Sequence, residues 1–474
     1  MADSRTKTLI KDTAWFAIGN FGSRVLSLLL VPLYTSVLST EEYGTADILN
    51  TTVNLAVPIL TLSVQDATFR FALDKNINLK GVFTSSFFIA LISPAILVLM
   101  YPVINLFLPV VGDYWWYFIA IYCGHSLSGL LGNFLKATNK THIFAAQGIL
   151  YTFLFAGLNI VFLVVVKIGI AGYLLSFVLS YLASCFFMFV AGGLYQYLSI
   201  SCIDKPLLKE MLRYSMPLIP AAIAWWIMSS IDKYMLLYMK GTESTGLYGV
   251  AHKIPTVVTT VMTFFVNSWQ ITAVRSKDDS DISSYVSNMY KILVGFGILF
   301  TYVLVLLSQP LGKFMFAKEF YPAWTMSASL CVATLISTLS LILGAQFTAC
   351  KRSDLHLKSN LISMGANIVL NYFLITLLGI NGAAYGTMLS FFIVMIYRHY
   401  KVKQLIDFQV NAKKIYVCFL LLMGSAVVTG FDVPYYYVVV LMAFAVSTAI
   451  NFNEVKSIIS FFIKQINRHI PSRT

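Results

Sequence analysis

Long apolar stretches recur along the whole chain and are separated by short polar segments that hold most of its charge. Each stretch of about 18 residues or more can cross, as a helix, a hydrocarbon core about 30 Å thick. The first, residues 14–38, is too long for a cleavable signal peptide and has no small-residue cleavage site after it. The pattern predicts about fourteen membrane-spanning helices: 12–38, 45–73, 81–109, 114–138, 142–166, 169–198, 212–239, 246–274, 285–312, 321–350, 355–379, 381–406, 413–431 and 433–453.

The composition supports an all-α polytopic membrane protein without a large soluble domain. Of the 474 residues, 58% are hydrophobic and 11% charged, whereas a soluble domain carries about 25% charged residues. Five of the six cysteines lie inside apolar runs, Cys202 lies outside them, and none has CxxC spacing. We therefore interpret them as small hydrophobic residues rather than as disulfides or metal ligands.

The placement of basic residues predicts the orientation. Of the 33 Lys and Arg residues, 26 fall on one side of the predicted spans, four on the other and three within them. This asymmetry puts both termini in the cytoplasm and supports an even number of spans. Because the net charge of +13 is scattered over the gaps rather than gathered in one patch, it indicates topology and argues against nucleic-acid binding.

A weak internal repeat spans most of the chain. Spans two and eight open on similar segments, around Tyr43 and Tyr248, and later matches keep the same order at an offset near 210 residues. Six spans per repeat is an even number, so the two lobes share one orientation and relate by an axis along the membrane normal. We expect an N-lobe over 1–205, a C-lobe over 206–406, and two further helices with a basic cytoplasmic tail over 407–474. The later matches pair Ala137, Lys140, Thr141, Asn159 and 169–172 with Ala349, Arg352, Ser353, Asn371 and 379–382.

The sequence contains no complete motif of a soluble enzyme. The chain has no GxxxxGK[ST] loop, no HExxH and no histidine cluster. The segment from Gly124 to Ser128 departs from a nucleophile elbow at its last position and lies inside a predicted helix. We therefore predict a non-enzyme with no cofactor or metal centre.

Charged residues inside the membrane are costly and mark functional sites. Arg24 lies about twelve residues into the first span, so it is roughly 18 Å deep; a structural ion pair with Asp66 is the alternative. Asp232 and Lys233 are neighbours in span seven. His252 and Lys253 in span eight replace Asp47 and Ile48 of span two, which suits an anionic ligand. Cations for substrate binding are predicted at Arg24, Lys233, Lys253 and His252.

The remaining intramembrane charges are assigned to coupling or charge balance, namely Asp66, Asp232, Asp47 and Arg70. Asp66 and Arg70 are spaced i, i+4, so a simple salt bridge at the cytoplasmic mouth is an equal alternative. Aromatic residues near the cations suit sugar rings and phosphates, although membrane-interface belts explain them too. These are Trp225, Trp226, Tyr234, Tyr238 and Tyr248.

Several segments resemble the polysaccharide-specific transporters, the Wzx-type flippases of the multidrug/oligosaccharidyl-lipid/polysaccharide (MOP) exporter superfamily. They are 32–35 with 38–44 around the first outer turn, and 231–233 with 246–253 around the corresponding turn of the second half. Residues 23–26, around Arg24, are similar to the first-helix arginine segment of lipid II flippases. The resemblance covers nearly the whole chain, but its motifs assign a family better than a substrate.

The resemblance implies two six-helix bundles, as in MATE and MurJ proteins, and a groove for a lipid tail made by the last two helices. It implies a flippase in a bacterial cytoplasmic membrane, which moves an undecaprenyl-pyrophosphate-linked oligosaccharide to the outer leaflet by alternating access. Membrane lipids and the polysaccharide polymerase machinery are the implied partners, and Na⁺, H⁺ or the membrane potential stays open as the driving force. The rival functions are a cation-coupled multidrug antiporter, and a membrane glycosyltransferase or polymerase, which the short outer loops disfavour.

Overall fold

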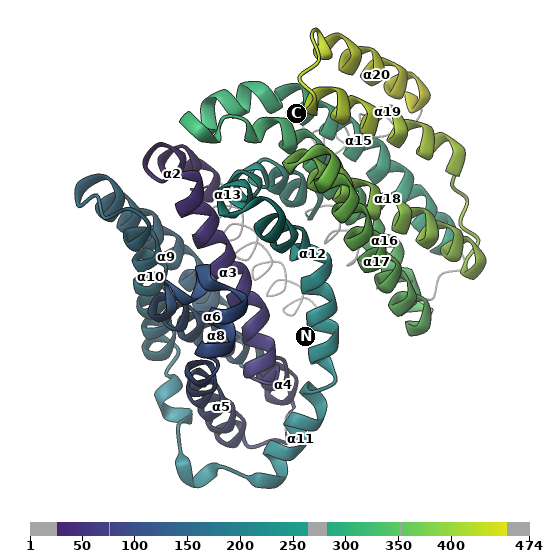
Figure 1. The fold of residues 1–474 in the computed structure, drawn as a ribbon. Coiled ribbons are helices and arrows are strands. Elements are labelled where there is room, and N and C mark those ends of the chain that lie inside the picture. Colours follow the sequence, from purple (N-terminus) through teal and green to yellow (C-terminus); the bar gives the residue numbers. More distant parts are fainter. Residues whose placement is uncertain (1–25, 75, 264–281, 351, 453–474) are drawn as a thin grey trace, which may run out of the picture. The chain divides into compact units, whose positions relative to one another are not determined.

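The structure is a computed structural model that describes residues 26–74, 76–263, 282–350 and 352–452. Within these ranges all regular structure is helical, as the sequence predicts. The chain forms two compact units, residues 1–230 and 231–474 (Figure 1). The predicted lobe boundaries near residues 205 and 406 stay predictions.

The first unit is built around α8, which packs against α3, α4, α5 and α10. Two polar caps begin its neighbours. Ser39 and Glu42 form a reciprocal capping box ahead of α3, and the Asn78 side chain caps α5. The helices are α2 (Val31–Val37), α3 (Thr40–Leu60), α4 (Val64–Ala72), α5 (Leu79–Leu99), α6 (Tyr101–Phe107), α7 (Pro109–Gly112), α8 (Trp115–Ala137), α9 (Thr141–Asn159), α10 (Gly169–Ala191), α11 (Lys205–Ser215) and α12 (Leu218–Lys240), the last of which continues into the second unit.

The predicted span 45–73 is broken. α3 and α4 meet at an angle of 60°, and two of the three residues between them, Leu62 and Ser63, have φ angles of 53° and 50°. Pro58 precedes the break, and its carbonyl accepts a hydrogen bond from the Ser63 amide at 2.8 Å. Two consecutive non-glycine residues in the left-handed region make this junction a strained bend rather than a smooth curve.

The second unit is centred on α16. Within the 18-residue apolar segment of this helix, 72% of the residues are buried. It packs against α13, α15, α18 and α19, while α17 and α18 run side by side, as do α19 and α20 (Figure 1). Its helices are α13 (Thr242–Ala251), α15 (Ile282–Met315), α16 (Ala323–Ala349), α17 (Ser353–Leu378), α18 (Ile380–Leu405), α19 (Ala412–Gly430) and α20 (Tyr436–Ile450).

Over the described residues, ten helices are long and apolar enough to cross a membrane, or eleven if the bent α3–α4 pair is one span. Two shorter apolar helices, Leu26–Val37 and Tyr436–Ile450, fall in the first and last predicted spans. The first half of span one and the end of span eight lie outside the described residues.

The repeat has local counterparts in each unit. α9 begins at Thr141 and α17 at Ser353, as the offset requires. Gly169 and Gly379 both have positive φ, 55° and 64°, immediately before the cores of α10 and α18. A φ in this region favours glycine, which explains why the two matching motifs each begin with it. The axis that relates the two lobes stays a prediction.

Candidate functional site

One membrane-buried carboxylate joins three helices of the second unit. Asp232 on α12 has only 4% of its surface exposed. Its Oδ2 accepts a hydrogen bond from the Tyr248 hydroxyl of α13 at 2.6 Å and one from the Thr387 hydroxyl of α18 at 3.2 Å. Burial penalises an isolated carboxylate heavily, and these two hydroxyl donors partly offset that penalty. Asp232 is thus held in place by neutral dipoles.

The hydrogen bonds continue into α17. The Asn367 amide donates to Thr387 Oγ1 at 3.4 Å and to Ser390 Oγ at 3.2 Å, and the Asn371 amide donates to Asn367 Oδ1 at 3.0 Å. A Cβ at Gly386 would overlap the side-chain Oδ1 of Asn371. The absence of a side chain at Gly386 therefore lets Asn371 approach α18. The cluster of Asp232, Tyr248, Thr387, Asn367 and Asn371 is called the Asp232 cluster below.

The donor set of the Asp232 cluster is oxygen: a carboxylate, two hydroxyls and two amide carbonyls. Asn371 Oδ1 is buried and accepts no hydrogen bond from the part of the chain that the structure describes. Oxygen ligands suit hard cations such as Na⁺, and a buried carboxylate also suits a proton. Among the same residues, no group of three His, Cys, Asp or Glu side chains comes together, so the cluster lacks the ligands of a transition-metal centre.

The structure describes three of the four basic residues that are predicted to bind substrate. Arg24 lies outside the described residues. Lys233, His252 and Lys253 are half-buried in the second unit. The His252 ring lies edge-on to Tyr248, with 4.7 Å between the ring centroids. One predicted basic residue therefore contacts the tyrosine that donates to Asp232, and the binding of an anion by these residues stays a prediction.

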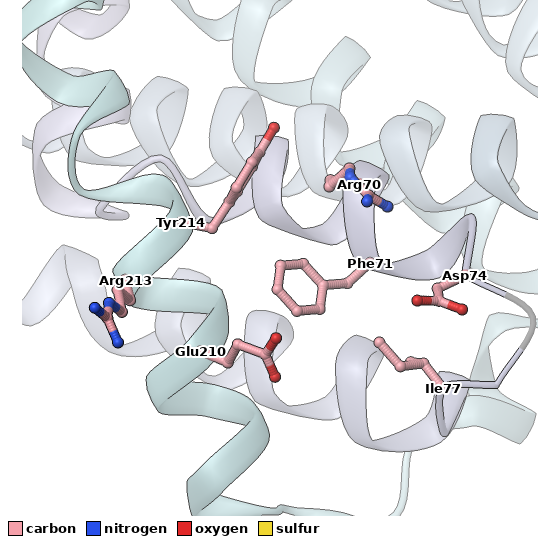
Figure 2. Close-up of a pocket in the computed structure, with 7 residues that line it drawn as sticks. All are labelled: Arg70, Phe71, Asp74, Ile77, Glu210, Arg213 and Tyr214. Carbon is pink, nitrogen blue, oxygen red and sulfur yellow. The ribbon is translucent and has the colours of Figure 1, made fainter.

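Asp66 and Arg70 form no ion pair with each other, so the simple salt bridge between them is wrong. Lys136 of α8 lies close enough to interact electrostatically with Asp66, and its ammonium lies over the Phe69 and Phe144 rings at 5.8 and 4.9 Å. Arg70 instead lines a cavity between α4 and α11 (Figure 2). Asp47 is half-buried on α3, one turn after Tyr43.

The predicted aromatic residues divide into buried and exposed ones. Trp226 is buried, and its indole donates to the Thr51 carbonyl at 2.9 Å, which ties α12 to α3. Tyr234 and Tyr248 are also buried. Trp225 and Tyr238 are 65% and 64% exposed. Tyr248 thus supports Asp232 through its hydroxyl, while the rings of Trp225 and Tyr238 are left uncovered.

Sequence reasoning missed a second buried charge. Arg398 on α18, which the charge count assigned to the cytoplasm, is only 2% exposed. It donates to Ser359 Oγ at 3.0 Å, to the Ser340 carbonyl at 2.9 Å and to Asn360 Oδ1 at 2.7 Å. It thereby joins α16, α17 and α18. A signal was available, because Arg398 follows an apolar run directly within the same predicted helix.

Solved structures share this fold. A lipid II flippase MurJ in an inward closed conformation aligns with a TM-score of 0.66 at 15% identity, over 93% of this chain and 99% of that one. An inward-facing multidrug resistance MATE family transporter of the MOP superfamily aligns at 0.60 and 14% identity, over 81% and 95%. A MOP superfamily transporter from Pyrococcus furiosus aligns at 0.53 and 13% identity, over 84% and 96%.

At these identities the likeness establishes the fold alone, which is the one found in MATE and MurJ proteins, as predicted. No curated protein sequence matches this chain. The family model described as "Polysaccharide biosynthesis protein" matches residues 9–270, more than half of the sequence. The chain therefore belongs to the polysaccharide biosynthesis protein family.

Proposed function

We propose that this protein is a flippase that moves a lipid-linked oligosaccharide, carried on undecaprenyl pyrophosphate, from the inner to the outer leaflet of a bacterial cytoplasmic membrane by alternating access. The observation that carries the proposal is the family match over residues 9–270 on a chain folded like the lipid II flippase MurJ. Both termini lie in the cytoplasm, as the 26 basic residues on one side require. No step of covalent chemistry is needed, so the protein is not an enzyme.

The proposed cargo carries a diphosphate, and the basic residues Arg24, Lys233, Lys253 and His252 bind it. Guanidinium and ammonium groups in a poorly hydrated cavity attract such an anion strongly. The exposed ring of Trp225 packs against the oligosaccharide. Polymerase machinery then consumes the translocated lipid at the outer surface.

The Asp232 cluster supplies the coupling in this proposal. A carboxylate held by neutral donors gains most from a cation or proton, and Asp232 forms no ion pair within the part of the chain that the structure describes. Tyr248 joins that carboxylate to α13, which carries His252 immediately after its last residue. Loading Asp232 with Na⁺ or H⁺ therefore changes the electrostatics beside the diphosphate-binding residues.

The test is reconstitution of the purified full-length protein in vesicles that hold an undecaprenyl-pyrophosphate-linked oligosaccharide. Translocation is measured as access of an external glycosidase to the sugar, under imposed Na⁺, pH and potential gradients. We expect the wild type to transport, Arg24→Ala to be inactive, Arg24→Lys to keep partial activity because it loses only the bidentate fork, and Asp232→Asn to lose gradient dependence. Lys313→Gln, on the opposite side of the membrane, is the control. Failure to move the lipid together with efflux of cationic drugs would favour the antiporter instead.

A further inference from the structure

The first unit contains a cavity of about 360 Å³ between the end of the bent span and the helix that precedes α12. One wall is the end of α4 and the turn after it, and the other is α11 (Figure 2). The volume is at the small end of the range for ligand sites, about 300–1,000 Å³. The residues that matter for its chemistry are Arg70, Phe71, Asp74, Glu210, Arg213 and Tyr214. We call it the α4–α11 cavity.

The cavity is lined by equal numbers of positive and negative side chains. It holds two arginines, Arg70 and Arg213, and two acids, Asp74 and Glu210. Among the described residues, none of these four side chains forms an ion pair, and Asp74 accepts only a backbone hydrogen bond from Asn76 at 3.2 Å. A net charge of zero makes the cavity a poor site for a diphosphate. Charged acceptors and donors that line one cavity without net charge suit a neutral ligand with many hydroxyl groups.

An aromatic surface completes the arrangement. Phe71 and Tyr214 lie edge to face, with 6.0 Å between the ring centroids. Figure 2 shows the carboxylates of Asp74 and Glu210 directed toward the Phe71 ring from different sides. Phe71 is mostly buried, whereas Tyr214 is 42% exposed and offers its ring to a ligand. Apolar ring faces flanked by strong acceptors match the two surfaces of a sugar, one made of C–H groups and one of hydroxyls.

We propose that the α4–α11 cavity binds a neutral sugar of the cargo at the cytoplasmic face, before the lipid carrier is moved. The identity of the sugar as part of a lipid-linked cargo rests on the proposed function. The cytoplasmic placement follows from the charge asymmetry of the sequence, which puts residues 70–80 and 205–213 on the basic side. A sugar held here contacts α4, which ends the bent span, and α11, which leads directly into α12.

The test is titration calorimetry on the purified full-length protein. The probe is the oligosaccharide repeat unit of the host's own surface polysaccharide, released without lipid or diphosphate. We expect Glu210→Gln and Asp74→Asn each to weaken binding of the probe about tenfold, because each replaces a charged acceptor by a neutral one of the same shape. Asp204→Asn is the matched control. Asp204 is exposed just before α11, its side chain does not cap the helix, and it lies outside the cavity. The affinity of the Asp204→Asn variant for the probe should therefore equal that of the wild type.

Unchanged affinity in both cavity variants would overturn the proposal, as would tighter binding of inorganic diphosphate than of the sugar. The proposed function is tested separately by vesicle transport. A protein that moves the lipid-linked oligosaccharide but does not bind the released sugar contradicts only the cavity assignment. A protein that binds the sugar in the cavity but moves no lipid contradicts only the flippase.

Discussion

The 2.6 Å hydrogen bond from Tyr248 to Asp232 gives the sharpest test of the buried site. Tyr248→Phe removes one hydroxyl and keeps the ring, which is fully buried. A hydrogen bond to a charged acceptor contributes about 1.5–3 kcal/mol, and a buried acceptor that loses its donor bears the full desolvation cost. For a unit the size of residues 231–474, this corresponds to a fall in Tm of roughly 3–12 °C. The measurement is thermal unfolding of the purified protein in detergent.

Tyr385→Phe is the matched control. Tyr385 is also buried in the second unit, but its hydroxyl has no hydrogen-bond partner among the described residues. Removing that hydroxyl should leave Tm unchanged or raise it slightly, because a buried unsatisfied group is deleted. Equal shifts for the two variants would refute the reasoning, since the loss could then be assigned to any buried tyrosine hydroxyl.

Three further variants test separate parts of the structure. Gly379→Ala should destabilise the protein by about 1–3 kcal/mol, because a side chain is strained at the φ of 64° and ψ of −138° that Gly379 adopts. Gly365 has open space around it, so Gly365→Ala should be neutral or stabilising in the same thermal unfolding measurement. Arg398→Lys should cost at least about 2 kcal/mol by the same measurement, because the ammonium cannot serve all three acceptors. Hydrogen bonding to Ser199 holds the pKa of the Cys202 thiol below its usual range, so more thiolate is present at neutral pH. Iodoacetamide labelling of Cys202 should therefore level off at a lower pH than labelling of an ordinary thiol does. A labelling profile like that of an ordinary thiol would contradict this prediction.

The spans were predictable because membrane insertion depends on a one-dimensional property of the sequence. The predicted span 114–138 is α8, Trp115–Ala137, and 381–406 is α18, Ile380–Leu405. A window of about 20 apolar residues is sufficient information for such an assignment. The break at Leu62 and Ser63 was not predicted, because neither residue type favours positive φ and Pro58 alone does not fix where a helix bends.

The buried Asp232 cluster was only partly apparent from the sequence. Asp232 stands out in sequence because a carboxylate in an apolar span is costly. Its partners do not stand out, since Tyr248 is 16 residues away and Thr387 is 155 residues away. Threonine in an apolar helix is common and carries no signal of its own. Arg398 was missed for a different reason: counting cations by side assumes that a basic residue near a helix end faces water.

Two buried charges among the described residues of the second unit, Asp232 and Arg398, are both held at α18. α18 carries Thr387, which donates to Asp232, and Arg398, eleven residues further on, which is roughly 16 Å along the helix. Direct pairing of Asp232 with an arginine would have neutralised its charge. Instead each charge is held by neutral donors or acceptors on neighbouring helices. In the proposed function, this arrangement lets Asp232 gain and lose a cation while Arg398 anchors α18.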